Sequence, residues 1–172
     1  MQFAALSIRR HKWPQVATIL LRNFFMKSLL LSLCFFVFAS SISLAQKSPV
    51  NTSSGAAIKG YDAVAYFTDG KPLKGSKKFS FNWQGSDWLF STQENQKTFA
   101  ANPEKYAPQY GGYCAFGVSE GHKAAIDPEA WTIVEGKLYL NYNKQVKTEW
   151  MKNEKERIDQ ANMNWPKIKD KE

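Results

Sequence analysis

An apolar run near the N-terminus constrains this chain more than any other feature. Residues 29–38 are almost entirely apolar and follow a lysine. Small residues come next, with Ser43 and Ala45 flanking Leu44, as in a signal-peptide cleavage site. The run is about half as long as a membrane-spanning helix, which needs ~20 apolar residues. We therefore expect a signal peptide over residues 26–45, cleavage near Ala45, a periplasmic or secreted protein, and no permanent membrane anchor.

The segment before Met26 is longer than a signal peptide requires. Met26 is followed by a lysine and a serine, which is typical of the start of a signal peptide and favours Met26 as the first residue. The alternative is that residues 1–25 form a long basic segment ahead of the apolar run. Both interpretations stay open at this stage.

Cleavage changes the composition that matters for function. Removing residues 1–45 of 172 leaves 127, enough for one domain with a single core. Five basic residues and no acidic residue precede the cut, so the net charge falls from +8 to +3. A nucleic-acid partner is not expected, because nucleic-acid binding needs a clustered basic face. The mature chain keeps one cysteine, Cys114, and one histidine, His122, and cannot form an internal disulfide.

Aromatic residues that alternate with polar ones predict a first β-hairpin. Residues 79–83 carry Phe, Phe and Trp at every second position, and a turn at 84–87 leads to a second strand at 88–90. Residues 61–67 are strand formers and predict another strand. The segment 46–57 contains Ser, Thr, Asn, Pro and Gly without apolar periodicity and predicts a flexible linker.

Capping residues predict a short central helix after the hairpin. Ser91 or Thr92 is a suitable N-cap, and Pro103 follows the end of the helix. One further turn is expected over 103–106. Residues 110–128 contain four glycines and little periodicity, so we expect an irregular folded loop there.

A second hairpin and a C-terminal helix complete the expected fold. Strands are predicted at 131–134 and 138–140. Asn143 is the expected N-cap of a helix that runs to about Ala161, within a C-terminal segment 144–172 that ends in a charged tail. These elements predict an α+β fold of small antiparallel β-hairpins, a short central helix and a longer C-terminal helix.

Five signatures occur in order along residues 60–143. They are G-Y-D-A-V-A-Y-F at 60–67, W-L-F-S at 88–91, F-A-A-N-P-E-K-Y at 99–106, Y-G-G-Y-C-A at 110–115 and G-K-L-Y-L-N-Y-N at 136–143. The ordered set resembles the YHS domain family, in particular its exported bacterial single-domain members. The resemblance implies a compact hairpin-and-helix domain over 58–143 and, in metal-handling relatives, a site for a heavy metal such as copper or zinc.

The same resemblance implies cysteine ligands that this chain lacks. Metal-handling relatives carry one cysteine just after the aspartate that corresponds to Asp62, and a cysteine pair between the hairpin and the helix. The corresponding segments here are 63–67 and 91–95, and neither contains cysteine. Metal binding through the usual thiolates of the family is therefore not carried over to this chain.

Cys114 and His122 are the candidate metal ligands. Cu(I) is a soft ion that accepts two or three thiolate, thioether or imidazole ligands, and Met151 or Met163 would supply a third. Zinc in a closed site needs four ligands, so copper is the better match. The alternative is that Cys114 is a small buried hydrophobic residue and that His122 is exposed to solvent.

Two other function classes remain open. A thiol-dependent enzyme would use Cys114 as nucleophile and His122 as base, but the sequence offers no orienting residue and no second thiol. A module that binds a non-metal ligand or an envelope protein is the other class. Six residues either line its pocket or serve only as caps and packing: Asp62, Tyr66, Tyr110, Tyr113, Asp127 and Trp131. HExxH, GxSxG and phosphate-binding loops are missing, so we expect a binding protein rather than an enzyme.

Overall fold

The computed structural model describes residues 49–52 and 54–171, all of which lie in one unit, Gln46–Glu172. The predicted signal peptide and the segment before it lie outside the described residues. Within the described part, no helix is long and apolar enough to cross a membrane.

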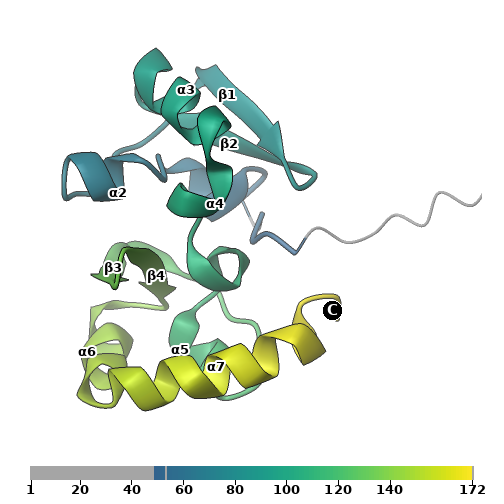
Figure 1. Ribbon diagram of the computed structural model, residues 1–172, viewed down its shortest axis with the longest axis vertical. Helices are drawn as coiled ribbons and strands as arrows, with labels where there is room; N and C mark the ends of the chain where they lie inside the picture. Colours follow the sequence, from purple (N-terminus) through teal and green to yellow (C-terminus); the bar gives the residue numbers. More distant parts are fainter. Residues whose placement is uncertain (1–48, 53, 172) are drawn as a thin grey trace, which may run out of the picture. The chain divides into compact units, whose positions relative to one another are not determined.

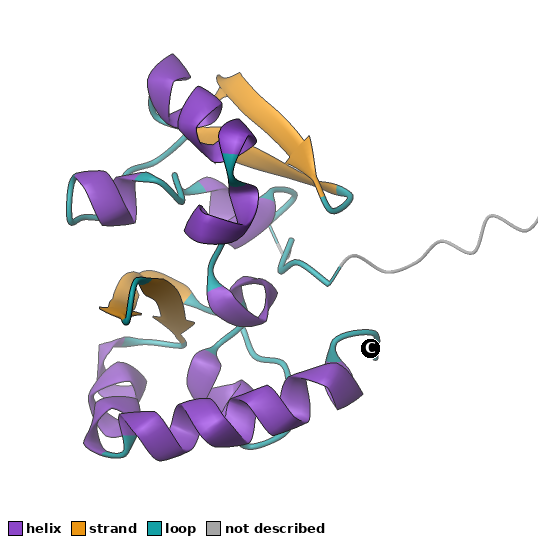
Figure 2. Ribbon diagram, in the orientation of Figure 1, coloured by secondary structure: helices purple, strands orange, loops and turns teal. Residues whose placement is uncertain are grey.

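Two antiparallel hairpins and a set of helices form the domain (Figures 1 and 2), which confirms the α+β prediction. In chain order the elements are η1 (Ala57–Gly60), α2 (Ala65–Thr68), β1 (Ser76–Trp83), β2 (Ser86–Phe90), α3 (Gln93–Ala101), α4 (Pro103–Tyr106), η2 (Gln109–Gly112), α5 (Ala115–Ser119), β3 (Asp127–Val134), β4 (Lys137–Asn141), α6 (Lys144–Lys152) and α7 (Glu154–Ile168).

The β1–β2 hairpin packs against α3 through aromatic side chains. Phe81 pairs with Trp88 across the hairpin. The ring of Phe99, on α3, lies 5.0 Å from Trp88 and 5.1 Å from Phe90 between centroids, and all three are fully or almost fully buried. Thr92 caps α3 by accepting a hydrogen bond from the backbone N–H of Asn95 at 3.1 Å. The predicted hairpin and central helix are both confirmed.

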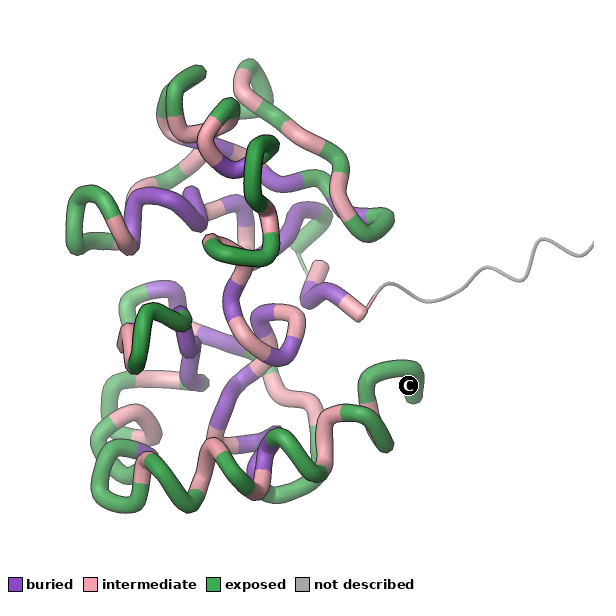
Figure 3. Tube along the Cα trace, in the orientation of Figure 1, coloured by how far each residue is buried: buried purple, intermediate pink, exposed green. Residues whose placement is uncertain are grey.

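The C-terminal part of the chain packs against the β3–β4 hairpin. Asn143 caps α6 by accepting from the backbone N–H of Val146 at 2.8 Å. Trp150, fully buried on α6, packs against Tyr139 of β4 with ring centroids 5.3 Å apart. Figure 3 shows exposed and partly buried positions alternating along α7, and Ala161 is fully buried.

The C-terminal helix differs from its prediction in two ways. The chain leaves helical geometry at Asn153 (φ −132°, ψ 43°), which separates α6 from α7. The helix then continues past Ala161 to Ile168 and includes Pro166. Packing explains the extension, because the ring of Trp165 lies 6.1 Å from that of Tyr110.

The predicted strand over 61–67 is wrong. Tyr61 makes only an isolated bridge, with Lys74. Asp62 Oδ1 then accepts hydrogen bonds from the backbone N–H groups of Val64 and Ala65, at 2.9 and 3.2 Å. These bonds turn the chain into the short helix α2, since a side chain that binds the backbone two and three residues ahead competes with an extended strand.

Two segments expected to be irregular are more ordered than the sequence indicated. Within the predicted linker, Val50 and Asn51 are buried, and the backbone N–H of Asn51 donates to Gly111 O at 2.8 Å. Gly111 permits this contact, because a Cβ there would overlap the carbonyl oxygen of Pro49. The predicted loop 110–128 begins with the end of η2 and contains α5.

Candidate functional site

The two segments where the resemblance implies cysteines meet at Asp62. Its carboxylate is completely buried. Oδ1 accepts the two bonds that form α2, and Oδ2 accepts three more: from the backbone N–H of Ser91 at 2.8 Å, from Ser91 Oγ at 2.6 Å and from Asn95 Nδ2 at 2.7 Å. We call Asp62, Ser91 and Asn95 the Asp62 cluster.

The Asp62 cluster does not fit a metal ion. An ionised carboxylate offers about four lone-pair sites, and five donors already occupy the two oxygens of Asp62. Neither segment contributes a thiol. The cluster is a structural link that fixes α2 to the start of α3.

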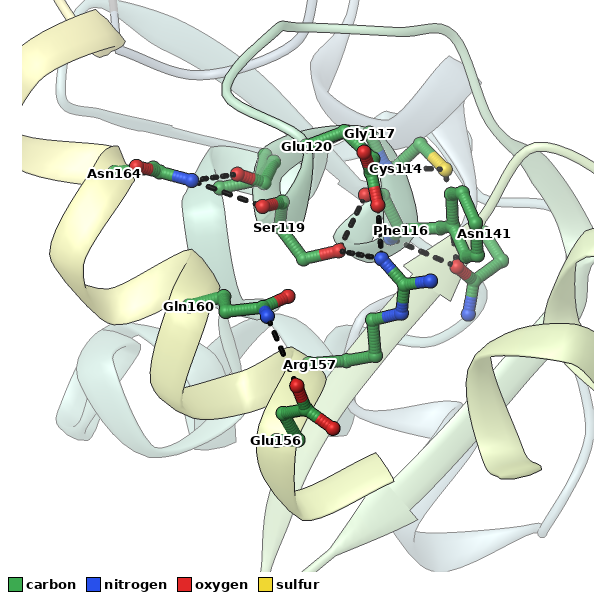
Figure 4. Close-up of polar contacts among 11 residues, drawn as sticks. Cys114, Phe116, Gly117, Ser119, Glu120, Asn141, Glu156, Arg157, Gln160 and Asn164 are labelled. Carbon is green, nitrogen blue, oxygen red and sulfur yellow. Dashed lines mark hydrogen bonds and ion pairs between the residues drawn. The ribbon is translucent and has the colours of Figure 1, made fainter. Parts of the chain in front are cut away.

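Cys114 lies at the N-cap of α5, almost completely buried, and bridges in parallel to Leu140 of β4. Its Sγ accepts from the backbone N–H of Gly117 at 3.5 Å and donates to Asn141 Oδ1 at 3.7 Å (Figure 4). Burial raises the pKa of the Cys114 thiol, and backbone N–H groups of Gly117, Tyr142 and Phe116 offset part of that rise. The neutral thiol is therefore the favoured form.

Asn141 connects this thiol to the backbone of α5. Its Oδ1 also accepts from the backbone N–H of Phe116 at 3.1 Å. Its Nδ2 is buried and finds no hydrogen-bond partner among the described residues. A buried donor without a partner costs roughly 1–3 kcal/mol, so this amide has bonding capacity that the fold does not use. We call Cys114, Asn141 and Gly117 the Cys114 cluster.

His122 is exposed, but it lies against the same helix as Cys114. Its backbone N–H donates to Gly117 O at 3.0 Å. Its Nε2 lies 3.3 Å from the point that a Cβ on Gly117 would occupy. Cys114 and His122 thus both contact Gly117.

The candidate third ligands face solvent. Met151 on α6 and Met163 on α7 are 49% and 62% exposed. Over the part of the chain that the structure describes, no group of three or more Cys, His, Asp or Glu side chains is placed to hold a metal ion. Any metal held by Cys114 and His122 therefore relies on a small number of protein ligands.

The opposite end of α5 faces a polar hollow of about 430 Å³ against α7. Arg157 pairs there with Glu120, donates to Ser119 Oγ at 3.3 Å, and lies over the ring of Phe116 at 4.3 Å (Figure 4). The hollow is lined by Ser119, Glu120, Gly121, Asn153, Glu156, Arg157, Gln160 and Asn164. Sequence analysis missed it, although the polar spacing of four of these residues along α7 was a usable signal.

The residues proposed for an aromatic pocket serve as packing and caps. Tyr66 donates from its hydroxyl to Pro128 O at 3.1 Å and packs against Trp131. Tyr110 donates to Asn162 Oδ1 at 3.1 Å, and burial raises the pKa of both tyrosines. Asp127 accepts from the backbone N–H of Glu129 at 3.0 Å. These contacts agree with the second of the two interpretations given above.

Comparison with known proteins gives one family match. The family model of the YHS domain matches residues 64–110. No significant match was found among curated proteins or among solved structures. The matched stretch contains α2, the first hairpin, α3 and α4. It ends before Cys114, His122 and the polar hollow, so these features lie in the part of the chain that the family model does not cover.

Proposed function

Because the YHS domain model matches residues 64–110 of this chain, and that family includes metal-handling proteins, we propose that the chain is an exported binding protein for Cu(I). Cys114 and His122 are the ligands. The observation that carries the proposal is their shared contact with Gly117. Its N–H donates to the sulfur of Cys114, and a Cβ placed on it would lie 3.3 Å from Nε2 of His122. Two residues that are eight positions apart in the sequence therefore both contact the same residue of α5.

The donor set suits Cu(I) better than other metals. Cu(I) is stable with two soft or borderline ligands, whereas a closed zinc site needs four. Copper would be bound and released here, and it would not take part in a reaction. The backbone N–H of Gly117 donates to the sulfur at 3.5 Å. Together with the N–H groups of Tyr142 and Phe116, it offsets part of the rise in the pKa of the thiol. Since the thiol loses a proton when the metal binds, affinity rises with pH.

The same thiol argues against catalysis by Cys114. A nucleophilic cysteine needs substantial thiolate at neutral pH, and catalytic cysteines reach it through a lowered pKa. Burial raises the pKa of Cys114 instead. This supports a binding protein over a thiol-dependent enzyme.

Export supports the assignment of a thiol ligand. The apolar run at 29–38 and the small residues before Gln46 are typical of a signal peptide. A mature chain with Cys114 as its single cysteine has no internal disulfide partner for it. Cell fractionation should find a chain that begins at Gln46 outside the cytoplasm, and a full-length cytoplasmic chain would contradict export.

Elemental analysis tests the metal. Protein isolated from the extracytoplasmic fraction of its native host should contain about one copper per chain. The Cys114→Ala variant, checked for folding by near-ultraviolet circular dichroism, should contain none. Equal copper content in the two proteins would contradict the site, and a folded wild-type protein free of copper would contradict the function.

A further inference from the structure

Helix α7 presents two different stripes. The buried or partly buried apolar residues Ile158, Ala161, Trp165 and Ile168 pack into the core around Tyr110 and Trp150. Beside them runs a polar stripe at spacings of four, three and four residues, which begins at the N-cap of α7 and continues along one face of the helix. The members of this stripe are Asn153, Arg157, Gln160 and Asn164. They line the polar hollow at the C-terminal end of α5.

Arg157 is the fixed centre of the hollow. Its side chain is only 21% exposed. It pairs with Glu120, donates to Ser119 and covers the ring of Phe116, so contacts on three sides restrict it. The side chain of Glu120 neutralises the guanidinium. A bound molecule is therefore not required to bring a negative charge.

The amide side chains of the hollow are also held in place. Asn164 Nδ2 donates to Val118 O at 3.2 Å and to Ser119 O at 2.9 Å, which caps the end of α5. Gln160 Nε2 donates to Glu156 Oε1 at 3.2 Å. In both amides the N–H groups point to protein acceptors. Among the described residues no donor is paired with the amide oxygen of Asn164 or Gln160, so both oxygens can accept from a ligand.

The residues that line the hollow favour some classes of ligand over others. An anion would approach the carboxylates of Glu120 and Glu156, and a cation would approach Arg157. An apolar molecule would leave the amides and charges of the hollow without hydrogen bonds, which is costly. A hydroxyl group both donates and accepts, so it pairs with amide oxygens, carboxylates and the guanidinium alike.

We propose that the hollow between α5 and α7 binds a neutral, hydroxyl-rich ligand, namely a saccharide unit. Its volume of about 430 Å³ lies within the range of small-molecule sites, roughly 300–1,000 Å³. This site is separate from the copper ligands. Loss of copper binding would therefore leave it unaffected.

Amide-resolved NMR of the isotope-labelled protein, isolated from cells that express the full chain, tests the site. The neutral probes are maltose and N,N′-diacetylchitobiose, and the charged probes are sodium sulfate and ethylammonium chloride. At least one disaccharide should give saturable shifts at Ser119, Glu120 and Gly121. Binding should change by less than about twofold when salt is raised from ~0.05 to ~0.5 M, because a neutral ligand is not screened.

Matched glutamines provide the control. Gln160→Ala removes an acceptor from the hollow and should weaken binding about fivefold, as for one lost hydrogen bond. Gln145→Ala, the same change at an exposed position of α6, should leave binding unchanged. The proposal is overturned if neither disaccharide gives saturable shifts, if Gln160→Ala binds like wild type, or if only a charged probe binds and salt abolishes it.

Discussion

The Asp62 cluster and the Cys114 cluster use buried polar groups in opposite ways. Each joins segments that are far apart in the sequence, Asp62 to Ser91 and Cys114 to Asn141. In the first, five donors saturate one carboxylate. In the second, a thiol and an amide share one weak bond at 3.7 Å, and Asn141 Nδ2 has no partner among the described residues.

The difference distinguishes buried polar groups that only stabilise the fold from buried polar groups that can still bind a ligand. A network in which every group is bonded stabilises one conformation and offers nothing to a ligand. A buried polar group with spare capacity costs stability, and such groups often mark a site with another role. By this criterion the Asp62 cluster is structural. The Cys114 cluster lies beyond the stretch that the family model matches and keeps an unused donor at Asn141 Nδ2. The copper site that we propose includes its thiol.

The largest effect is expected at the Asp62 cluster. Asp62→Ala removes a charged acceptor and leaves Ser91 and Asn95 without their partner, so the free energy of unfolding should fall by about 3 kcal/mol or more. Urea denaturation measures this. Asp69→Ala, at an exposed aspartate seven residues away, should change it by less than ~0.5 kcal/mol. A loss below ~1 kcal/mol at Asp62 would contradict a structural role.

A smaller loss is expected at the Cys114 cluster. Asn141→Ala removes the acceptor of the Phe116 N–H but also removes a donor that had no partner. The free energy of unfolding should therefore fall by only about 1–2 kcal/mol. The same urea experiment applies, and a loss as large as that of Asp62→Ala would remove the distinction between the two clusters.

The Cys114 thiol should also make the stability of the protein depend on pH. The raised pKa of Cys114 means that the folded state favours the protonated thiol more than the unfolded state does. The contribution to stability is full below the unfolded pKa of about 8.5 and is lost as pH rises through the folded pKa. The difference in unfolding free energy between wild type and Cys114→Ala should shrink from pH 7 to pH 10. A difference that grows over this range would mean that the folded state holds a thiolate.

The smallest effect on stability is expected at His122. Its side chain is exposed, so His122→Ala should change the free energy of unfolding by less than ~0.5 kcal/mol. A loss above ~1 kcal/mol would show that the imidazole packs as part of the fold, and would weaken its assignment as a ligand.

Local patterns predicted most of the fold. Alternation found the first hairpin, and two runs of strand-forming residues found the second. The caps Thr92 and Asn143 placed the starts of α3 and α6. The strand predicted over 61–67 was wrong, because Asp62 bonds the backbone ahead of it and is held there by Ser91, 29 residues further along the chain. No window of local sequence contains that contact.

The sequence predicted which residues form the candidate site, but it did not predict their surroundings in the fold. Cys114 and His122 followed from counting the thiols and imidazoles that would remain after the predicted cleavage. Their common contact with Gly117 depends on the short helix α5. The glycines in this segment led to the prediction of a loop instead of a helix. The polar hollow could not be predicted, because it forms where α5 packs against α7, and a hairpin and α6 separate these two helices in the sequence.

The proposed site can be tested by a Cu(I) competition titration against a coloured chelator, under reducing conditions without oxygen. Wild type should remove about one equivalent of Cu(I) from the chelator, and His122→Ala should bind more weakly. Cys114→Ala should not compete, while Asp69→Ala should behave as wild type. Competition by Cys114→Ala equal to that of wild type would contradict the proposed site.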